Sequence, residues 1–329
     1  MTATIPEHKR TNASGASISR LLITRHDKIG DFVLALPLCK AIKTEHPEIQ
    51  ISVLVAHVNY KFAREVNFID DVILYDENSN EILANIKDRQ FDASISCFID
   101  TKLGYLLWRA GIPLRISPAT KLAQLFFNSR INQRRSQVRK TEWQYNVELG
   151  RSLLRLKDPA LTAPLIQFET LIPRNRVVFH PGFGGSSDGN LNIKDYLHLA
   201  KRASQVPGME VAFTFGPDDQ KTFHQIKSVL DFPATLILSE MSLMEFCKFL
   251  AQSRLLISTS TGPMHLAGAV NSSTISFFGE SLFASSKRWA TVSNPTRQHN
   301  FMIGKTYSED TVFDVERAML DVLTRKHDL

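Results

Sequence analysis

The sequence lacks the short motifs that mark several common classes of enzyme. Neither half has G-x-G-x-x-G after its first predicted strand, and G-x-x-x-x-G-K-[ST] does not occur, which argues against dinucleotide redox chemistry and P-loop chemistry. No G-x-S-x-G elbow occurs, and no His, Cys or carboxylate residues have the spacing of metal ligands. Serine-hydrolase and metal-dependent reactions are therefore disfavoured, and we expect neither a metal nor a cofactor.

Cysteine is scarce, and long apolar runs are absent. Cys39, Cys97 and Cys247 lie far apart in apolar contexts without a C-x-x-C pair, which predicts buried free thiols in a reducing cytoplasm. No apolar run reaches the roughly 20 residues that a membrane-spanning helix needs. Residues 1–18 form a polar leader, predicted to be disordered, without a secretory h-region. We expect a soluble, cytoplasmic protein whose contact with a membrane would be peripheral.

The length of the chain indicates how many domains it has, and its net charge indicates what kind of partner it binds. A chain of 329 residues is longer than one hydrophobic core usually supports, so two domains are expected. The net charge of +6 favours anionic partners such as phosphates, nucleic acid or an acidic membrane surface. The basic residues concentrate in one segment and no recognisable nucleic-acid module is present, so a nucleic-acid partner is not expected.

Short apolar segments rich in β-branched residues alternate with helical patterns along the chain. This alternation predicts an α/β fold of two Rossmann-like, doubly wound parallel-sheet domains. We place the first domain at 19–165, the second at 170–309 and a C-terminal amphipathic helix at 310–329. The predicted strands are 21–24, 51–55, 72–74, 93–98 and 111–116 in the first domain, and 177–179, 211–215, 235–238, 255–257 and 274–278 in the second.

The stretch from Arg254 to Glu280 predicts a strand, a tight loop, a helix and a second strand. Four hydroxyl residues precede Gly262 and Pro263, and proline suits the first helical position. These hydroxyls either cap the helix or line a phosphate site, because helix N-termini carry partial positive charge and unpaired N–H groups. His265 either contributes to that site or only packs. We assign donor binding to Ser260, Thr261, Gly262, Pro263, Met264 and His265.

Further loops follow predicted strand ends of the second domain, where open α/β sheets bind ligands. The run H-P-G-F-G-G-S-S, from His180, either lets backbone N–H groups approach a diphosphate or is a flexible turn. Asp218, Asp219 and Glu240 are candidates either for accepting a ribose hydroxyl or for capping a helix. We assign further donor contacts to His180, Gly182, Gly184, Gly185, Ser186, Ser187, Gly216, Asp219 and Met241.

Asp31 is the candidate general base. It follows Gly30 at a predicted strand-to-helix turn, and a lone carboxylate there would take a proton from a nucleophilic hydroxyl within about 3 Å. The alternative role is a helix N-cap, and Asp27 is the rival base. Pro37 cannot lie deep in an α-helix, so either a separate first turn precedes it or the helix begins near it.

A basic segment interrupts the strand–helix rhythm between residues 120 and 145. Arginine and lysine residues cluster there, with Phe126, Phe127 and Trp143 at the edges. The segment is either a solvated loop or a site for an anionic, membrane-held substrate. Its cations are Arg130, Arg134, Arg135, Arg139 and Lys140.

Taken together, these motifs resemble the heptosyltransferase family of lipopolysaccharide core biosynthesis, from about Leu21 to Gly279. R-H-D-K-I-G-D-F-V-L-A-L-P, from Arg25, is similar to the family's R-x-[DS]-x-[IL]-G-D-[VI]-[VIL]-x-[TA]-L-P. R-A-G-I-P-L-R-I, from Arg109, is similar to A-G-[IV]-x-x-R-[IV]-G. The loop from His180 resembles the family's nucleotide-phosphate loop, and S-T-G-P-M-H-L-A-G-A resembles D-[ST]-G-x-x-H-[LI]-x-A-A.

The resemblance implies a GT-B fold whose two domains face a central cleft. It implies inverting, metal-independent transfer of heptose from ADP-heptose to a lipopolysaccharide core or related surface glycan, with Asp31 as base and the donor on the second domain. The acceptor would be an anionic glycolipid met at the cytoplasmic face of the inner membrane. We assign acceptor binding to Arg25, Lys28, Arg115, Arg130, Arg134, Arg135 and Lys140.

Two positions depart from the family's pattern. The Asp before [ST]-G is Ser260 here, and the Lys two residues before a Trp corresponds to Gly189 before Leu191. A donor diphosphate must therefore find another cation or rely on backbone donors and hydroxyls. Two alternatives remain open: a non-catalytic protein that binds a nucleotide sugar on this fold, and a sugar-nucleotide epimerase or hydrolase.

Overall fold

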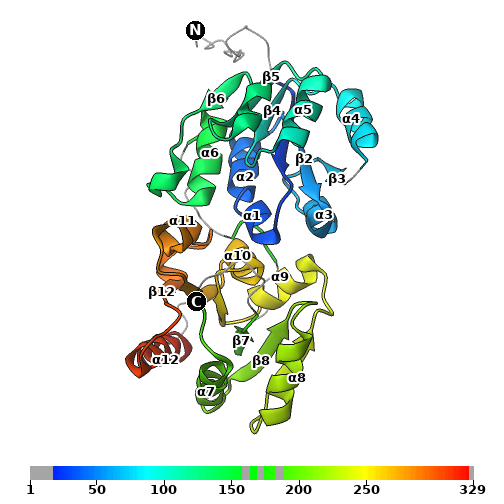
Figure 1. The fold of residues 1–329 in the computed structure, drawn as a ribbon. Coiled ribbons are helices and arrows are strands. Elements are labelled where there is room, and N and C mark those ends of the chain that lie inside the picture. The colour runs from blue at the N-terminus through cyan, green and yellow to red at the C-terminus, as the bar shows by residue number, and fades with distance from the viewer. Residues whose placement is uncertain (1–17, 77, 158–163, 169–173, 183–188, 326–329) are drawn as a thin grey trace, which may run out of the picture. The chain divides into compact units, whose positions relative to one another are not determined.

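The structure, a computed structural model, describes residues 18–76, 78–157, 164–168, 174–182 and 189–325. These residues form two six-stranded parallel sheets with flanking helices, as the alternating sequence pattern predicts (Figure 1). All ten predicted strands are present, with ends shifted by a few residues. The two sheets belong to two compact units, which are described separately below.

The first sheet has the strand order β3-β2-β1-β4-β5-β6. Its strands are β1 (Arg20–Arg25), β2 (Gln50–Ala56), β3 (Asp71–Tyr75), β4 (Ala93–Ser96), β5 (Leu114–Pro118) and β6 (Ser129–Ile131). The helices around it are α2 (Leu36–Glu45), α3 (His57–Arg64), α4 (Ser79–Asp88), α5 (Thr101–Arg109), α6 (Glu142–Arg151) and the 3-10 turn η1 (Leu122–Phe126). The 3-10 turn η2 (Arg135–Gln137) belongs to the unit of the second sheet. Apolar side chains of α4, α5 and η1 pack on one face of the sheet, against Leu22, Leu54 and Ile73.

The second sheet has the order β12-β11-β10-β7-β8-β9. Its strands are β7 (Arg176–His180), β8 (Glu210–Phe215), β9 (Thr235–Leu238), β10 (Leu255–Thr259), β11 (Ser273–Phe278) and β12 (Gln298–Met302). Its helices are α7 (Ile193–Ser204), α8 (Gln220–Val229), α9 (Leu243–Ala251), α10 (Gly262–Ala269), α11 (Ser286–Trp289) and α12 (Glu309–Thr324), with the 3-10 turns η3 (Leu282–Ala284) and η4 (Pro295–Arg297).

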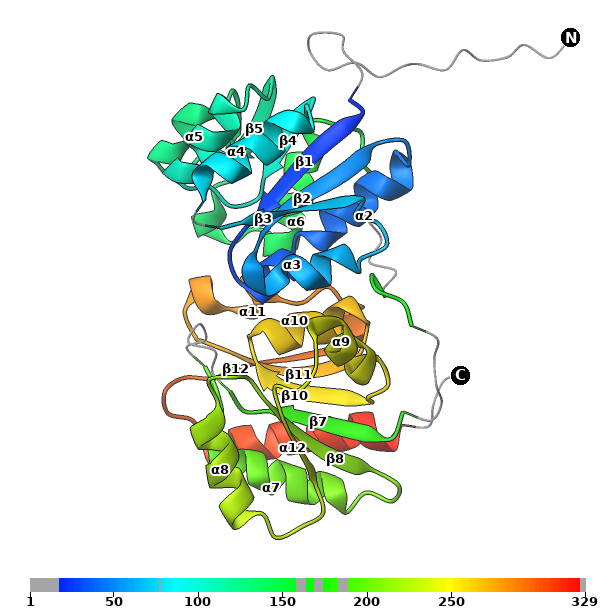
Figure 2. The ribbon, with the colours of Figure 1, turned by 90° about the vertical axis from the view of Figure 1, so that its right-hand side faces the viewer.

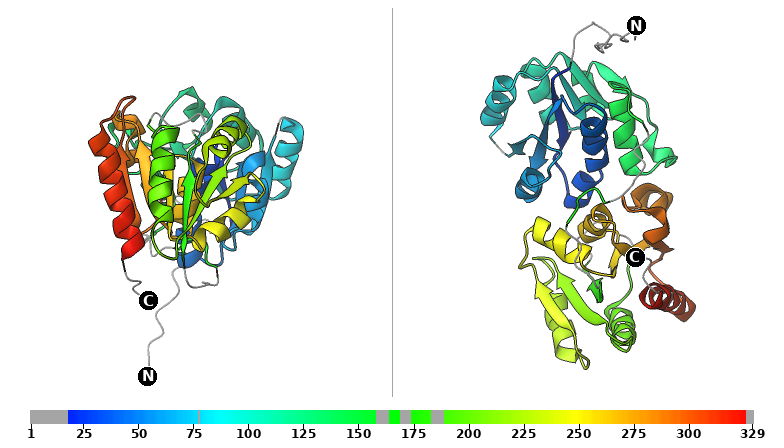
Figure 3. Two further views of the ribbon diagram at one scale, coloured as in Figure 1. Left: turned by 90° about the horizontal axis from the view of Figure 1, so that it is seen from below. Right: turned by 180° about the vertical axis from the view of Figure 1, so that it is seen from behind.

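The two faces of the second sheet are covered differently. Large side chains of α7, α8 and α12 pack on one face against alternate strand residues such as Phe179, Phe213 and Phe277. Figures 2 and 3 show α7 and α12 side by side, where His198 and Glu316 join them through a 2.8 Å contact. The opposite face is covered by α9 and α10 (Figure 2). The small residues of α10 let that helix lie close on the sheet.

A short helix, α1 (Ile29–Val33), precedes α2, which begins at Leu36. Pro37 therefore occupies the first turn of α2, where its missing N–H has no intrahelical partner to lose. Both sequence alternatives for this region hold, because a separate helical turn comes first and the longer helix begins next to Pro37.

The compact units do not follow the chain in two simple halves. The first takes in the described residues within 1–27, 38–133 and 146–158, and the second those within 28–37, 134–145 and 159–329. The segment that carries α1 and the segment around η2 thus group with the second sheet. All three cysteines are free and buried, as predicted.

Candidate functional site

The strand order of the second sheet indicates a candidate position for a ligand. The chain runs outward from β7 through β8 and β9, and then outward in the other direction through β10, β11 and β12. Ligands of open parallel sheets bind outside the carboxyl ends of the strands at such a switch point. His180 ends β7 and pairs with Ser258 near the end of β10. Pro181 and Ser260, which follow these strand ends, therefore lie on either side of the switch point.

The N-terminus of α10 has no side-chain cap. Thr261 is the N-cap residue, but its hydroxyl donates to the Thr259 carbonyl at 3.3 Å instead of accepting from the helix. Pro263 has no N–H, so the first-turn donors are the amides of Gly262 and Met264. The hydroxyl cap that the sequence left open does not form. A helix N-terminus whose amides have no side-chain cap is a candidate anion site.

A carboxylate lies over the glycines at the ends of β7 and β8. Asp219 Oδ2 accepts a 2.9 Å hydrogen bond from the Gly216 amide, and Asp219 does not cap α8 with its side chain. A Cβ at Gly182 would collide with this carboxylate. Of the two sequence alternatives for Asp219, the helix cap is therefore wrong. Its carboxylate instead holds the Gly216 turn against Gly182.

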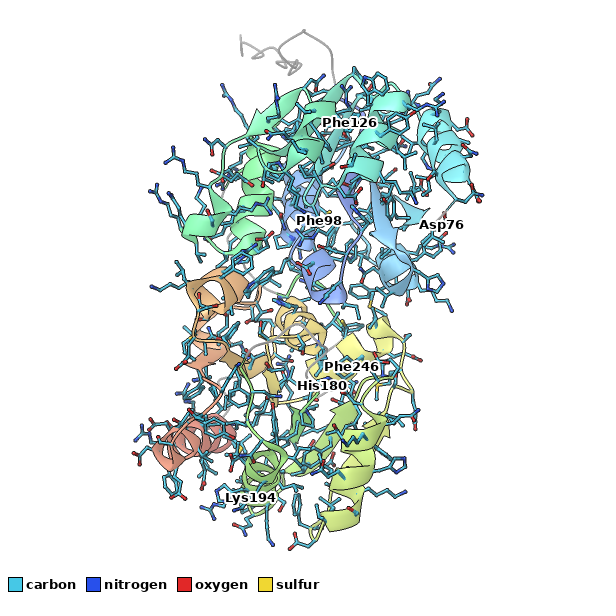
Figure 4. The ribbon with its side chains drawn as sticks, viewed as in Figure 1. Asp76, Phe98, Phe126, His180, Lys194 and Phe246 are labelled. Carbon is cyan, nitrogen blue, oxygen red and sulfur yellow. The ribbon has the colours of Figure 1, made fainter. Side chains whose placement is uncertain are left out.

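His180 is buried next to this carboxylate. Its Nδ1 lies 3.0 Å from Thr214 Oγ1. Burial lowers the pKa of His180 to about 4, although the negative charge of Asp219 acts in the opposite direction. The imidazole is therefore neutral at pH 7. Figure 4 labels His180 at the end of β7.

Gly189 has no room for a side chain. A Cβ there would meet the carbonyl oxygens of Phe278 and Ile303, the latter at 2.7 Å. Its own carbonyl accepts a 2.5 Å hydrogen bond from Thr259 Oγ1. The absence of lysine at this position is therefore built into the packing of the loop against β10 and β11. Ser260, in contrast, is only half-buried, and its amide donates to the Phe277 carbonyl.

The turn that carries Asp31 packs on the first turn of α10. A Cβ at Gly30 would lie 2.6 Å from Cδ2 of His265, and a Cβ at Gly262 would lie 3.3 Å from Cβ of Ile29. Asp31, half-buried, is the third residue of α1, whose N-cap is Lys28. The N-cap alternative for Asp31 is therefore wrong. The candidate base follows directly after a residue that touches the predicted donor helix.

His265 is a buried neutral group. Burial lowers its pKa to about 3, and its Nδ1 has no hydrogen-bond partner among the described residues. Its ring covers Gly30, so packing is at least part of its role.

The switch point of the first sheet lies between β1 and β4, and two hydrogen-bonded side-chain pairs lie there. Arg25 Nε donates to Asp27 Oδ1 at 2.8 Å, and His26 Nε2 lies 2.5 Å from Asp100 Oδ2. Burial opposes ionisation of Asp100, but hydrogen bonds from His26 and the Leu103 amide hold the pKa of its carboxyl below the usual range. The rival base Asp27 is thus committed to Arg25, a buried residue that the sequence assigned to the acceptor.

The residues predicted to bind the acceptor differ in their surroundings. Arg115 donates from Nε to the Phe126 carbonyl at 2.8 Å and from Nη1 to the Ile112 carbonyl, so its guanidinium supports the local fold. Burial lowers the pKa of Arg115. The remaining predicted cations are exposed except for the half-buried Arg135: Lys28, Arg130, Arg134 and Lys140.

Glu142 forms contacts with two arginines, Arg135 and Arg288. It is 2 % exposed, with Oε1 2.5 Å from Arg135 Nη1 and Oε2 3.4 Å from Arg288 Nη2. The Arg288 guanidinium lies 3.8 Å from the centre of the Phe283 ring. The basic segment is therefore not a solvated loop throughout, because Glu142 anchors part of it within the second unit.

Four of the predicted donor-binding residues lie in a part of the chain that the structure does not describe. Gly184, Gly185, Ser186 and Ser187 lie outside the described residues. Met241 is half-buried in the turn between β9 and α9. Across the described ranges, no three His, Cys, Asp or Glu side chains are grouped as metal ligands. No helix in the described part of the chain is both long and apolar enough to cross a bilayer.

Sequence reasoning missed three relationships in these sites. The His26–Asp100 pair had a readable signal, because both residues follow predicted strands that flank the switch point. The Glu142–Arg288 pair had none, since the two residues are far apart in sequence and in no shared motif. The contact of Asp219 with Gly182 depends on side-chain direction, which strand order does not give.

Comparison with known proteins supports one family. The family model "Glycosyltransferase family 9 (heptosyltransferase)" matches residues 82–309. A Haemophilus influenzae protein named "Putative glycosyltransferase" is 32% identical over 302 residues, which cover 84% of this chain and 87% of that protein.

Solved structures with the same fold include two from E. coli. Heptosyltransferase WaaC with ADP is 16% identical, with 92% of this chain and 99% of that chain covered and a TM-score of 0.76. ADP-heptose lps heptosyltransferase II is 16% identical, with 93% and 98% covered and a TM-score of 0.74. At this identity the likeness concerns the fold, and it confirms the predicted pair of Rossmann-like domains of GT-B type.

Proposed function

The chain belongs to glycosyltransferase family 9, the heptosyltransferases, and from this premise we propose that it transfers heptose from ADP-heptose to an anionic lipopolysaccharide core or related surface glycan. It is a glycosyltransferase. Four details of the reaction are proposals: the donor, the acceptor, inversion at the anomeric carbon and independence of metal. A solved relative is titled as a complex of WaaC with ADP-2-deoxy-2-fluoro heptose, which supports this choice of donor.

The observation that carries the proposal is the contact between Gly30 and His265. It holds the α1 turn, and with it Asp31, against the first turn of α10. In the proposed reaction the Asp31 carboxylate accepts the proton of an acceptor hydroxyl. The hydroxyl oxygen attacks the anomeric carbon of the donor, and the bond to the diphosphate oxygen breaks. A carboxylate acting as general base contributes about 10²- to 10⁴-fold in rate.

The leaving diphosphate would be held mainly by backbone donors. The amides of Gly262 and Met264 have no side-chain cap, and Gly189 excludes the lysine found at this position in the family. Donors fixed in place before the reaction are each worth roughly 3 kcal/mol of transition-state stabilisation. The hydroxyls of Ser260 and Thr261 are the next groups along this loop. The nucleoside would lie toward Gly182 and Asp219, at the ends of β7 and β8.

The test incubates the purified chain with ADP-heptose and a heptose-deficient core acceptor, with EDTA present. We expect a heptosylated acceptor by mass spectrometry and an inverted anomeric centre by NMR. Transfer only with a different nucleotide sugar would replace the proposed donor, and transfer that stops in EDTA would overturn metal independence.

The missing Asp and Lys favour one competing function, a protein that binds a nucleotide sugar without turnover. Calorimetric binding of ADP together with no transfer to any core acceptor would support that function. Conversion of ADP-heptose in the absence of an acceptor would instead support an epimerase or hydrolase on this fold.

A further inference from the structure

Four polar side chains lie in a row across the second sheet, near the carboxyl ends of its strands. The strand register places Ser276 of β11 beside Ser258 of β10, and Ser258 beside His180 of β7. His180 contacts Thr214 of β8, with 3.0 Å between Nδ1 of the ring and Oγ1 of the hydroxyl. All four residues are buried. The residue before each of them in sequence is apolar and packs on the other face of the sheet, so the row faces α9 and α10.

Two of these side chains have no hydrogen-bond partner among the described residues. They are the hydroxyls of Ser258 and Ser276. His180 makes its hydrogen-bonded contact at Nδ1, and no contact of this kind is present at Nε2 within the described ranges. Buried polar groups in folded proteins nearly always have a partner, so unpartnered groups beside a candidate ligand position mark places for ligand atoms or ordered water.

The contact with Thr214 decides which nitrogen of the His180 ring carries the proton. Because burial lowers the pKa of His180 to about 4, the ring is neutral at pH 7, and one nitrogen donates while the other accepts. In the described part of the chain the Thr214 hydroxyl has no hydrogen-bonded contact other than Nδ1. Its buried proton is satisfied if it donates to Nδ1, and Nε2 then carries the ring proton.

Nε2 of His180 is therefore the nitrogen that can donate to a ligand. β7 ends at His180, and its neighbour β10 leads into the uncapped N-terminus of α10. The oxygen atoms of an ionised phosphate only accept hydrogen bonds, so a protonated Nε2 suits them and a bare Nε2 does not. Such an uncharged donor matters more here because Gly189 leaves no room for a lysine.

We propose that Thr214 is a positioning residue for the donor substrate. Its hydroxyl holds His180 in the tautomer with the proton on Nε2, and His180 donates from Nε2 to a phosphate oxygen of the nucleotide diphosphate. Thr214 acts through the ring and does not touch the donor. The inference rests on the proposed function in that the donor is a nucleotide-diphosphate sugar, and it holds for any transferred sugar and any acceptor.

The first test measures the affinity of the full chain for ADP by calorimetry. Thr214→Val removes the hydroxyl and should weaken ADP binding about three- to tenfold, the effect of one hydrogen bond between uncharged groups. Thr214→Ser keeps the hydroxyl and should bind ADP as the wild type does. The matched control is Thr274→Val on the same face of the sheet, because Thr274 is buried and its hydroxyl has no partner among the described residues. Its ADP affinity should be unchanged.

The second test asks whether Thr214 acts through His180. His180→Phe should weaken ADP binding by a similar factor, and Thr214→Val should cost nothing further in the His180→Phe background. Proton–nitrogen correlation NMR of the wild type, with His180→Phe identifying the signal, should show a proton on Nε2 and none on Nδ1. The Nε2 signal should shift when ADP is added, and Thr214→Val should change the ratio of the two tautomers.

Four outcomes would overturn the inference. They are no binding of ADP by the wild type, an ADP affinity that Thr214→Val leaves unchanged or Thr274→Val lowers equally, additive losses in the double variant, and a ring proton on Nδ1 that is donated to Thr214. A lowered melting temperature of Thr214→Val with normal ADP affinity would make the contact purely structural.

Transfer measured beside ADP binding separates this inference from the proposed function. A wild type that binds ADP and shows these losses in its variants, but transfers nothing, would remove the proposed function and leave the role of Thr214 intact. Heptose transfer by the wild type together with normal ADP affinity in Thr214→Val would do the reverse.

Discussion

Gly30 of α1 lies directly against the imidazole of His265 in α10, so closely that a Cβ at Gly30 would be 2.6 Å from Cδ2 of the ring. Glycine is required here by the close approach of two helices. The neighbouring contact of Gly262 with Ile29 has the same character. Because Asp31 is the next residue, the position of the candidate base depends on the absence of a side chain at Gly30.

Gly30→Ala should lower both stability and turnover. The added methyl group must displace His265 or move α1, at a cost of roughly 1 to 3 kcal/mol for overpacking. Urea denaturation measures the first effect, and the transfer assay measures the second. The control is the double variant Gly30→Ala/His265→Ala, which removes the clash. If the double variant is no more active than Gly30→Ala, the contact does not position Asp31.

Acidification should destabilise the chain through its buried histidines. Burial lowers the pKa of His180 to about 4 and of His265 to about 3, below the unfolded value of 6.5. The unfolded chain therefore binds protons first, and the stability present above pH 6.5 is lost as the pH falls toward the folded values. Between pH 7 and pH 5.5 the free energy of unfolding should fall by about 2 to 3 kcal/mol for the two histidines together.

Denaturation at several pH values checks this dependence, and His265→Gln should remove about half of the slope. A free energy of unfolding that stays constant down to pH 5.5 would mean that these imidazoles are not buried as neutral groups.

Restoring the family's residue should have different effects on stability at the two departing positions, Gly189 and Ser260. Gly189→Lys places a Cβ against the carbonyls of Phe278 and Ile303, so it should destabilise by more than about 3 kcal/mol. Ser260→Asp adds a carboxylate at a half-buried position and should change stability by less than about 1 kcal/mol. Melting temperature and ADP calorimetry measure both effects. A stable Gly189→Lys variant with tighter ADP binding would contradict the packing argument.

Removing the charge of Glu142 should be among the costliest changes in the basic segment. Glu142→Gln leaves the guanidiniums of Arg135 and Arg288 without their buried carboxylate, which costs about 3 to 5 kcal/mol. The exposed neighbours Arg134 and Arg139 serve as controls, and their change to Gln should alter stability by no more than about 0.5 kcal/mol. Equal denaturation midpoints for all three variants would show that Glu142 anchors nothing.

The sequence predicted ten of the twelve described strands, including the edge strands β3 and β9, and missed the other two edge strands. Buried parallel strands are apolar on both faces, so β1, β2 and β10 are visible as runs of Leu, Ile and Val, and β11 as a segment with Ile and Phe. The edge strands β6 and β12 consist of S-R-I and Q-H-N-F-M, whose polar and exposed residues give no such signal. Both were missed for that reason.

The loops of the candidate site could be predicted from the strand ends. The contacts that individual side chains make could not. Loops after β7 and β10 could be assigned because parallel strands bring their carboxyl ends to one edge. Sequence could not reveal that Arg115 serves backbone carbonyls or that Arg135 pairs with Glu142. These contacts depend on packing between segments that no local pattern connects.

The rate of transfer by Asp31→Asn, measured beside its affinity for ADP, tests most directly whether Asp31 is the general base. We expect a loss of about 10²- to 10⁴-fold in kcat with unchanged ADP affinity, because the general base is lost and the donor site is not. Asp27→Asn, which weakens only the pair with Arg25, should lose much less activity. Retained turnover in Asp31→Asn with normal ADP binding would mean that Asp31 is not the general base.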